Sequence, residues 1–181
     1  MTEIEIIVLS IALALDAMLV SFSYGLIINQ RRIYNSLLLS GSFGFFQFLM
    51  PIIGFYLTGL FYTNLQLYSK WIVCIIFMIL GLKFLKEALE KSEEKNEIQC
   101  IGFFCIFSLA IATSIDALGA GVSLKLLDVN HIMASIIIGL ITFILSMFGF
   151  WMTKLFSKMP AKYIGIIGSF LLIYLAIKAI L

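Results

Sequence analysis

Two aspartates, Asp16 and Asp116, are the only acidic residues well inside long apolar stretches of this sequence. A carboxylate at the centre of a lipid bilayer costs at least about 2.5 kcal/mol on insertion scales. Two carboxylates at related positions therefore predict a binding site for an ion or a proton. The alternative is a pair of protonated aspartates that hydrogen-bond to neighbouring helices.

Small and polar residues surround both aspartates at helical spacing. Residues three, four and seven apart share one face of a helix, and the faces of four stretches carry hydroxyl or amide groups. The predicted oxygen donors are Gln47, Thr113, Thr142, Ser146, Ser23 and Ser123. With two carboxylates they form a hard donor set, which suits Mg²⁺, Ca²⁺ or Mn²⁺ better than Cu(I) or Zn²⁺. For the polar faces that include Gln47 and Thr142, plain helix packing is the alternative.

The composition indicates which kind of protein must position these side chains. Of the 181 residues, 62% are apolar and 12% are charged, and the mean hydropathy is +1.13. A soluble domain has about 45–50% apolar and about 25% charged residues. The sequence therefore predicts an integral membrane protein in contact with the lipid bilayer. A net charge of +2 without a basic stripe argues against nucleic-acid binding.

Six apolar stretches have the length of about 20 residues that a membrane-spanning helix needs. These stretches are Ile4–Ile28, Leu37–Leu60, Leu67–Leu85, Ile101–Leu124, His131–Met152 and Tyr163–Leu181. They are continuous and do not alternate, which favours helices over a β-barrel. We therefore predict an all-α integral membrane fold with six transmembrane helices.

The first half of the chain resembles the second. When Asp16 is aligned with Asp116, Ser23 falls on Ser123, and when Ser40 is aligned with Ser135, Gly44 falls on Gly139. We predict one transmembrane transporter domain, residues 1–181, made of repeat one (1–95) and repeat two (96–181). Three helices per repeat is an odd number, so the repeats must cross the membrane in opposite senses. Inverted repeats of this kind place the binding site near the midplane.

The distribution of basic residues predicts the orientation in the cell membrane. Nine lysines and arginines fall in the connections on one side of the predicted membrane and three on the other. Because basic residues concentrate in cytoplasmic loops, the richer side faces the cytoplasm. A multi-pass protein with both termini outside the cytoplasm follows.

Four motifs resemble those of the MntP-type manganese efflux pumps, members of a lysine-exporter-like superfamily. The segments are Leu13–Ala17, Ala112–Ala117, Phe43–Gln47 and Thr142–Ser146. The resemblance covers nearly the whole chain. It implies a six-helix inner-membrane exporter that removes Mn²⁺ from the cytoplasm, with Asp16 and Asp116 as the leading functional residues. It also implies that Gln47 is a polar ligand at a position that is acidic in some relatives.

The predicted function is export of divalent manganese by a secondary transporter, with the ion as substrate, no cofactor and no enzymatic activity. The chain has no phosphate-binding loop, which argues against direct use of ATP. Alternatives are a transporter of Mg²⁺, Ca²⁺ or Cd²⁺, and a non-transporting relative associated with sporulation membranes. An intramembrane aspartyl protease is disfavoured, because Thr113–Ile115 replaces its glycine-rich motif. The sequence leaves a homo-oligomer open.

Overall fold

The computed structural model describes residues 3–28, 31–60, 69–89 and 103–153, together with residues 166, 170, 173, 174, 176 and 177. All regular secondary structure in these residues is α-helical. The elements are α1 (Glu3–Ile27), α2 (Arg32–Gly59), α4 (Ser69–Leu89), α5 (Phe103–Thr113), α6 (Ile115–Leu126) and α7 (His131–Met152). The all-α fold class is thus confirmed. The predicted stretch Tyr163–Leu181 lies largely outside the described residues, so a count of six transmembrane helices stays a prediction.

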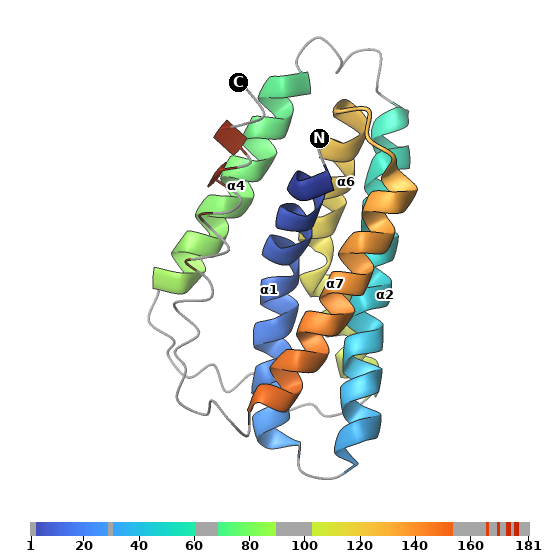
Figure 1. Ribbon diagram of the computed structural model, residues 1–181, viewed down its shortest axis with the longest axis vertical. Helices are drawn as coiled ribbons and strands as arrows, with labels where there is room; N and C mark the ends of the chain where they lie inside the picture. Colours follow the sequence, from blue (N-terminus) through green and yellow to red (C-terminus); the bar gives the residue numbers. More distant parts are fainter. Residues whose placement is uncertain are drawn as a thin grey trace.

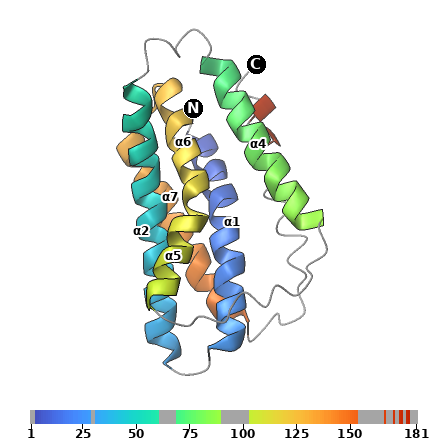
Figure 2. The ribbon, with the colours of Figure 1, turned by 180° about the vertical axis from the view of Figure 1, so that it is seen from behind.

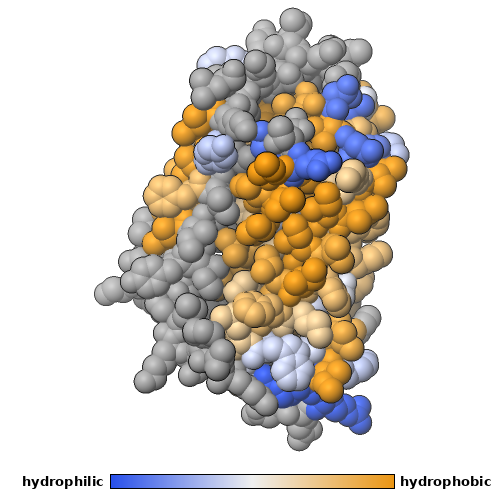
Figure 3. Space-filling view, viewed as in Figure 1, coloured by the Kyte–Doolittle hydropathy of each residue, from blue (hydrophilic) through white to orange (hydrophobic). Residues whose placement is uncertain are grey.

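Four segments of the described chain are long and apolar enough to cross a membrane. They are Glu3–Leu26, Arg32–Gly59, Phe104–Leu126 and His131–Met152. Large apolar side chains cover their outward faces, among them Ile136, Leu140 and Ile144 on α7. Figure 3 shows this surface as a hydrophobic band with hydrophilic residues at its two ends. This band is what a protein surrounded by lipid requires.

The helices form an upright bundle in which neighbours run in different senses (Figures 1 and 2). Helices α1, α4 and α7 run down the view of Figure 1, whereas α2, α5 and α6 run up it. The most extensive packing joins α1 to α7, α2 to α7 and α2 to α6. Two parallel pairs, α1 with α7 and α2 with α6, therefore meet along an antiparallel contact between α2 and α7.

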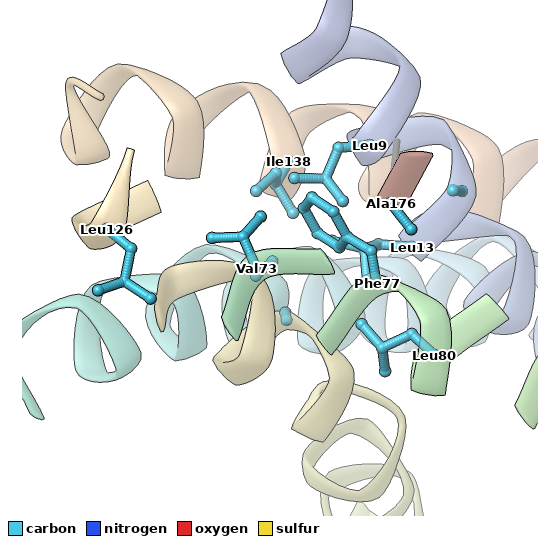
Figure 4. Packing of buried hydrophobic residues seen from close by; sticks show 11 residues of the cluster. Leu9, Leu13, Val73, Phe77, Leu80, Leu126, Ile138 and Ala176 are labelled. Carbon is cyan, nitrogen blue, oxygen red and sulfur yellow. The ribbon is translucent and has the colours of Figure 1, made fainter. Parts of the chain in front are cut away.

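Helix α4 packs on the side of this bundle through apolar side chains. Val73, Phe77 and Leu80 of α4 belong to one buried cluster with Leu9 and Leu13 of α1, and Figure 4 shows how these side chains gather. The cluster also includes Ala117 and Ala120, so it joins α4 to α1 and to α6. It places a buried apolar layer beside the two segments that carry the aspartates.

Several helix boundaries differ from the sequence prediction, and α4 continues to Leu89, beyond the predicted Leu85. Helix α2 begins at Arg32, earlier than the predicted Leu37. The stretch predicted as one helix, Ile101–Leu124, is interrupted at Ser114, where φ is −91° and ψ is 0°. The Ser114 hydroxyl donates to the carbonyl of Ile111 at 2.9 Å. Serine hydroxyls compete in this way with backbone hydrogen bonding and disturb helices, which explains the division into α5 and α6.

Candidate metal site

The two aspartates occupy different local structures. Asp16 lies in the middle of the continuous helix α1 and is half-buried, and its Oδ1 accepts a hydrogen bond from the backbone N–H of Ala17 at 2.6 Å. Asp116 lies in the first turn of α6, directly after the interruption at Ser114, and is only 6% exposed. The positive end of the α6 dipole favours a negative charge at that position. Asp116 is thus the more enclosed carboxylate.

Gln47 of α2 joins the segments that carry the two aspartates. Its side chain is fully buried, and its Nε2 donates to the carbonyl of Leu13 at 3.5 Å and to that of Thr113 at 3.4 Å. Each carbonyl belongs to the residue three positions before an aspartate. Because both carbonyl oxygens contact the same nitrogen atom, they lie close to each other. One amide group fixes the spacing between α1 and the α5–α6 break.

Two side-chain oxygens at this level have no hydrogen-bond partner. They are Oε1 of Gln47 and Oγ1 of Thr142, and both residues are fully buried. A buried polar atom without a partner costs about 1–3 kcal/mol. Pro51 adds a third oxygen, because it has no N–H to donate to the backbone carbonyl of Gln47. A bound cation would satisfy such oxygens.

The hydroxyls of the other predicted donors already have partners. Thr113 donates to the carbonyl of Ala110 at 3.2 Å. Ser23 and Ser123 donate to carbonyls of their own helices, at 3.1 Å and 3.2 Å. The structure thus brings Gln47 together with the backbone of Thr113, but gives no contact between Gln47 and Ser23 or Ser123.

Ser146 of α7 shares a short hydrogen bond with Ser21 of α1. Ser21 is not among the donors predicted from the sequence. The signal that could have found it is its position, because Ser21 aligns with Gly121 when Asp16 is aligned with Asp116. Where one half of the chain has a polar side chain and the other has glycine, the two corresponding helix contacts must be made in different ways.

Glycines bring the backbones of the core helices close together. A Cβ on Gly44 would lie 3.0 Å from the carbonyl oxygen of Gly139, and a Cβ on Gly139 would lie 2.9 Å from that of Gly44. Gly121 faces the carbonyl of Pro51 in the same way. Such small-residue contacts are typical of closely packed membrane helices. Here they also turn backbone carbonyls toward the neighbouring helices around the site.

Comparison with known proteins decides the family. Residues 30–180 match the model of the family described as "Putative manganese efflux pump". This chain belongs to that family. Its sequence is 37% identical to the "Putative manganese efflux pump MntP" of Crocosphaera subtropica, across the whole chain and 96% of that relative. It is 39% identical to the protein of the same name from Rippkaea orientalis, over 94% of the chain and 91% of the relative.

A third relative with that name, from Ruminiclostridium cellulolyticum, is 35% identical over 98% of the chain and 95% of its own length. The resemblance deduced from the motifs is therefore confirmed. A family of efflux pumps is a class of transporters and not a class of enzymes. No solved structure matches the chain significantly.

The candidate donors among the described residues are all oxygen atoms. The described residues contain no group of three or more His, Cys, Asp and Glu side chains that could hold a metal ion. A cation at the level of Gln47 would therefore combine carboxylates with neutral amide, hydroxyl and carbonyl oxygens. Mg²⁺, Ca²⁺ and Mn²⁺ accept such mixed oxygen sets.

Proposed function

We propose that this protein exports Mn²⁺ from the cytoplasm as a secondary transporter, and that it binds the ion between Asp16 and Asp116. One observation carries the proposal. The fully buried Gln47 contacts the backbone of both aspartate-bearing segments, while its own Oε1 has no partner. Family membership supports Mn²⁺ as the substrate, and the hydrogen bonds of Gln47 support a binding site between the two aspartates.

In this proposal the ligands differ in charge and in how readily their oxygens can bind the ion. Asp116 and Asp16 supply the charge, and Gln47 and Thr142 supply neutral oxygens that are free to bind. Thr113 lies beside Gln47, and Ser146 lies about one turn along α7 from Thr142, and the hydroxyls of both must exchange a present partner for the ion. Ser23 and Ser123 must do the same farther along their helices. Mn²⁺ prefers hard oxygen donors of this kind.

We further propose that the six predicted helices form two inverted repeats, which places the site near the membrane midplane. Matched contacts support this. Gly149 faces the carbonyl of Met18 on α1, and its aligned counterpart Gly54 faces that of Leu118 on α6. Gly44 and Gly139, which also align, face each other. Corresponding helices run in opposite senses, α1 against α5–α6 and α2 against α7 (Figure 1).

Such a protein would work by alternating access, opening the site first to the cytoplasm and then outward. We propose that the end of the bundle with Arg31, Arg32 and Lys86 faces the cytoplasm, since basic residues prefer that side. Lys125 lies at the other end. This orientation puts both termini outside the cytoplasm.

Uptake of Mn²⁺ into inverted membrane vesicles tests the proposal. We expect Asp16→Asn and Asp116→Asn to abolish uptake, because each removes a charge that balances the ion and keeps the size of the side chain. Asp128→Asn is the matched control. Asp128 is exposed and adopts φ 53°, a conformation that asparagine tolerates, so this variant should transport normally.

Wild-type uptake by both core variants would exclude the two-aspartate site. Competition by excess Mg²⁺, Ca²⁺ or Cd²⁺ in the same assay distinguishes the substrates, because the oxygen donors alone fit several hard cations. Strong inhibition by one of these ions, with weak transport of Mn²⁺, would make that ion the substrate.

A further inference from the structure

Four fully buried side chains on α2 and α7 have an oxygen without a hydrogen-bond partner. They are Ser40 and Gln47 on α2, and Ser135 and Thr142 on α7. Only Gln47 and Thr142 belong to the proposed site. Ser40 and Ser135 share the same unusual state, although neither is among the donors predicted from the sequence.

The packing of α2 on α7 sets the order of these four oxygens. The helices are antiparallel, and a Cβ on Gly44 would lie 3.0 Å from Cβ of Phe143, while one on Gly139 would lie 2.8 Å from Cβ of Phe48. In this register the four residues follow one another along the contact as Ser40, Thr142, Gln47 and Ser135. Successive positions differ by about one helical turn, roughly 5 Å. Ser40 and Ser135 are thus the two ends of a line with the proposed site in its middle.

Other buried serines show that the missing hydrogen bonds are specific to this contact. Ser36, also on α2 and fully buried, donates to the carbonyl of Ile33 at 2.9 Å. Ser10 on α1 donates to the carbonyl of Ile6 at 2.6 Å. A serine in a helix can normally bond to its own helix in this way. Ser40 and Ser135 do not, and their oxygens remain available in the contact between α2 and α7.

We infer that Ser40 and Ser135 are two further oxygen donors for the transported divalent cation, one on each side of the aspartate site. The inference rests on the proposed function. A hydrated cation that enters a dry bundle must replace its water ligands stepwise, and hydroxyl oxygens one turn apart offer such replacements. Ser40 binds the ion on the side of the site toward Arg32, and Ser135 binds it on the opposite side.

Uptake of Mn²⁺ by the purified full-length protein in proteoliposomes tests the inference, together with thermal unfolding of each variant. We expect Ser40→Ala and Ser135→Ala each to raise KM for Mn²⁺ about fivefold, which corresponds to about 1 kcal/mol. The unfolding temperature should stay equal or rise, because alanine removes an unsatisfied buried group. Ser36→Ala is the matched control, and it should keep KM while losing some stability with its hydrogen bond.

The results of these experiments distinguish failure of the serine assignment from failure of the proposed function. Wild-type KM in either Ser40→Ala or Ser135→Ala, with Asp16→Asn and Asp116→Asn inactive, overturns the paired assignment and leaves the proposed function standing. A raised KM accompanied by a lowered unfolding temperature assigns the serines to packing and also overturns it. Normal transport by the aspartate variants instead removes the proposed function itself.

Discussion

The contact between α1 and α7 and the contact between α2 and α6 are two versions of one arrangement. Both join parallel helices, and both bring a glycine against a backbone carbonyl. Their polar chemistry differs at aligned positions. In the first contact Ser21 bonds to Ser146, whereas in the second Gly121 packs on the carbonyl of Pro51.

The difference indicates that one contact is more rigid than the other. Helix α1 is continuous, and its contact with α7 is closed by a hydrogen bond. The second contact includes Pro51, which leaves a carbonyl of α2 without its helical donor, and lies beside the break at Ser114. Asp116, the more enclosed aspartate, lies directly after this break. We interpret the α1–α7 contact as the rigid side of the proposed site and the α2–α6 contact as the side that can rearrange around an ion.

Replacing Gly121 with alanine should have the largest effect. The new Cβ would collide with the backbone of Pro51, which cannot move as a flexible side chain could. We expect a loss of at least about 3 kcal/mol of stability, measured by thermal unfolding in detergent. Gly119→Ala on the same helix is the control, because its Cβ would lie 3.4 Å from Cγ2 of Ile76, an ordinary contact. Equal stability of the two variants would contradict the close approach of α2 and α6.

The second-largest effect on stability should come from replacing a cationic side chain, and the loss should differ between the two ends of the bundle. Arg32 donates to the carbonyls of Gly25 and Ile28, each at 3.2 Å, and lies 5.2 Å from the ring centroid of Phe150. Lys125 lies 4.6 Å from the ring centroid of Phe55, the residue that aligns with Phe150.

Arg32→Met should therefore cost about 2 kcal/mol, since it removes hydrogen bonds from a charged donor, and Lys125→Met should cost about 0.5 kcal/mol. Chemical denaturation in detergent measures both values. The reverse order would show that the end near Lys125 is the more tightly held.

Gln47→Leu tests the affinity of the candidate site itself. It keeps the approximate volume and removes the amide, so the affinity for Mn²⁺ should fall about tenfold, or about 1.4 kcal/mol. Isothermal titration calorimetry measures the dissociation constant. Gln47→Glu keeps an oxygen at this position and adds charge, and should bind at least as tightly as the wild type. Unchanged affinity in Gln47→Leu would remove this residue from the ligand set.

The smallest expected effect concerns the rigid side. Ser21→Ala should lose about 1 kcal/mol of stability, the usual value of one hydrogen bond. A double-mutant cycle with Ser146→Ala should return most of that value as coupling. Transport should stay normal in Ser21→Ala and decrease in Ser146→Ala, because only Ser146 is a proposed donor. Loss of transport in both variants would show that transport needs the Ser21–Ser146 hydrogen bond and not the Ser146 oxygen alone.

The sequence by itself determined the class of the molecule and selected candidate residues for its site. Continuous apolar stretches leave no option but lipid-embedded helices, and the cost of a carboxylate in lipid singled out Asp16 and Asp116. The motifs around them sufficed for the family. Gln47 was selected for its residue type, but its contacts with the carbonyls of Leu13 and Thr113 could not be deduced from spacing along one helix.

Only the tertiary structure decided which oxygens are free. A serine or threonine hydroxyl can bond to its own helix or remain available to a neighbour, and the sequence spacing is the same in both cases. Ser23 and Ser123 bond to their own helices, whereas Ser40, Ser135 and Thr142 do not. Ser40, Ser135 and Thr142 all lie on α2 or α7, which pack closely at Gly44 and Gly139, and a contact between residues so far apart in the sequence follows only from the tertiary structure.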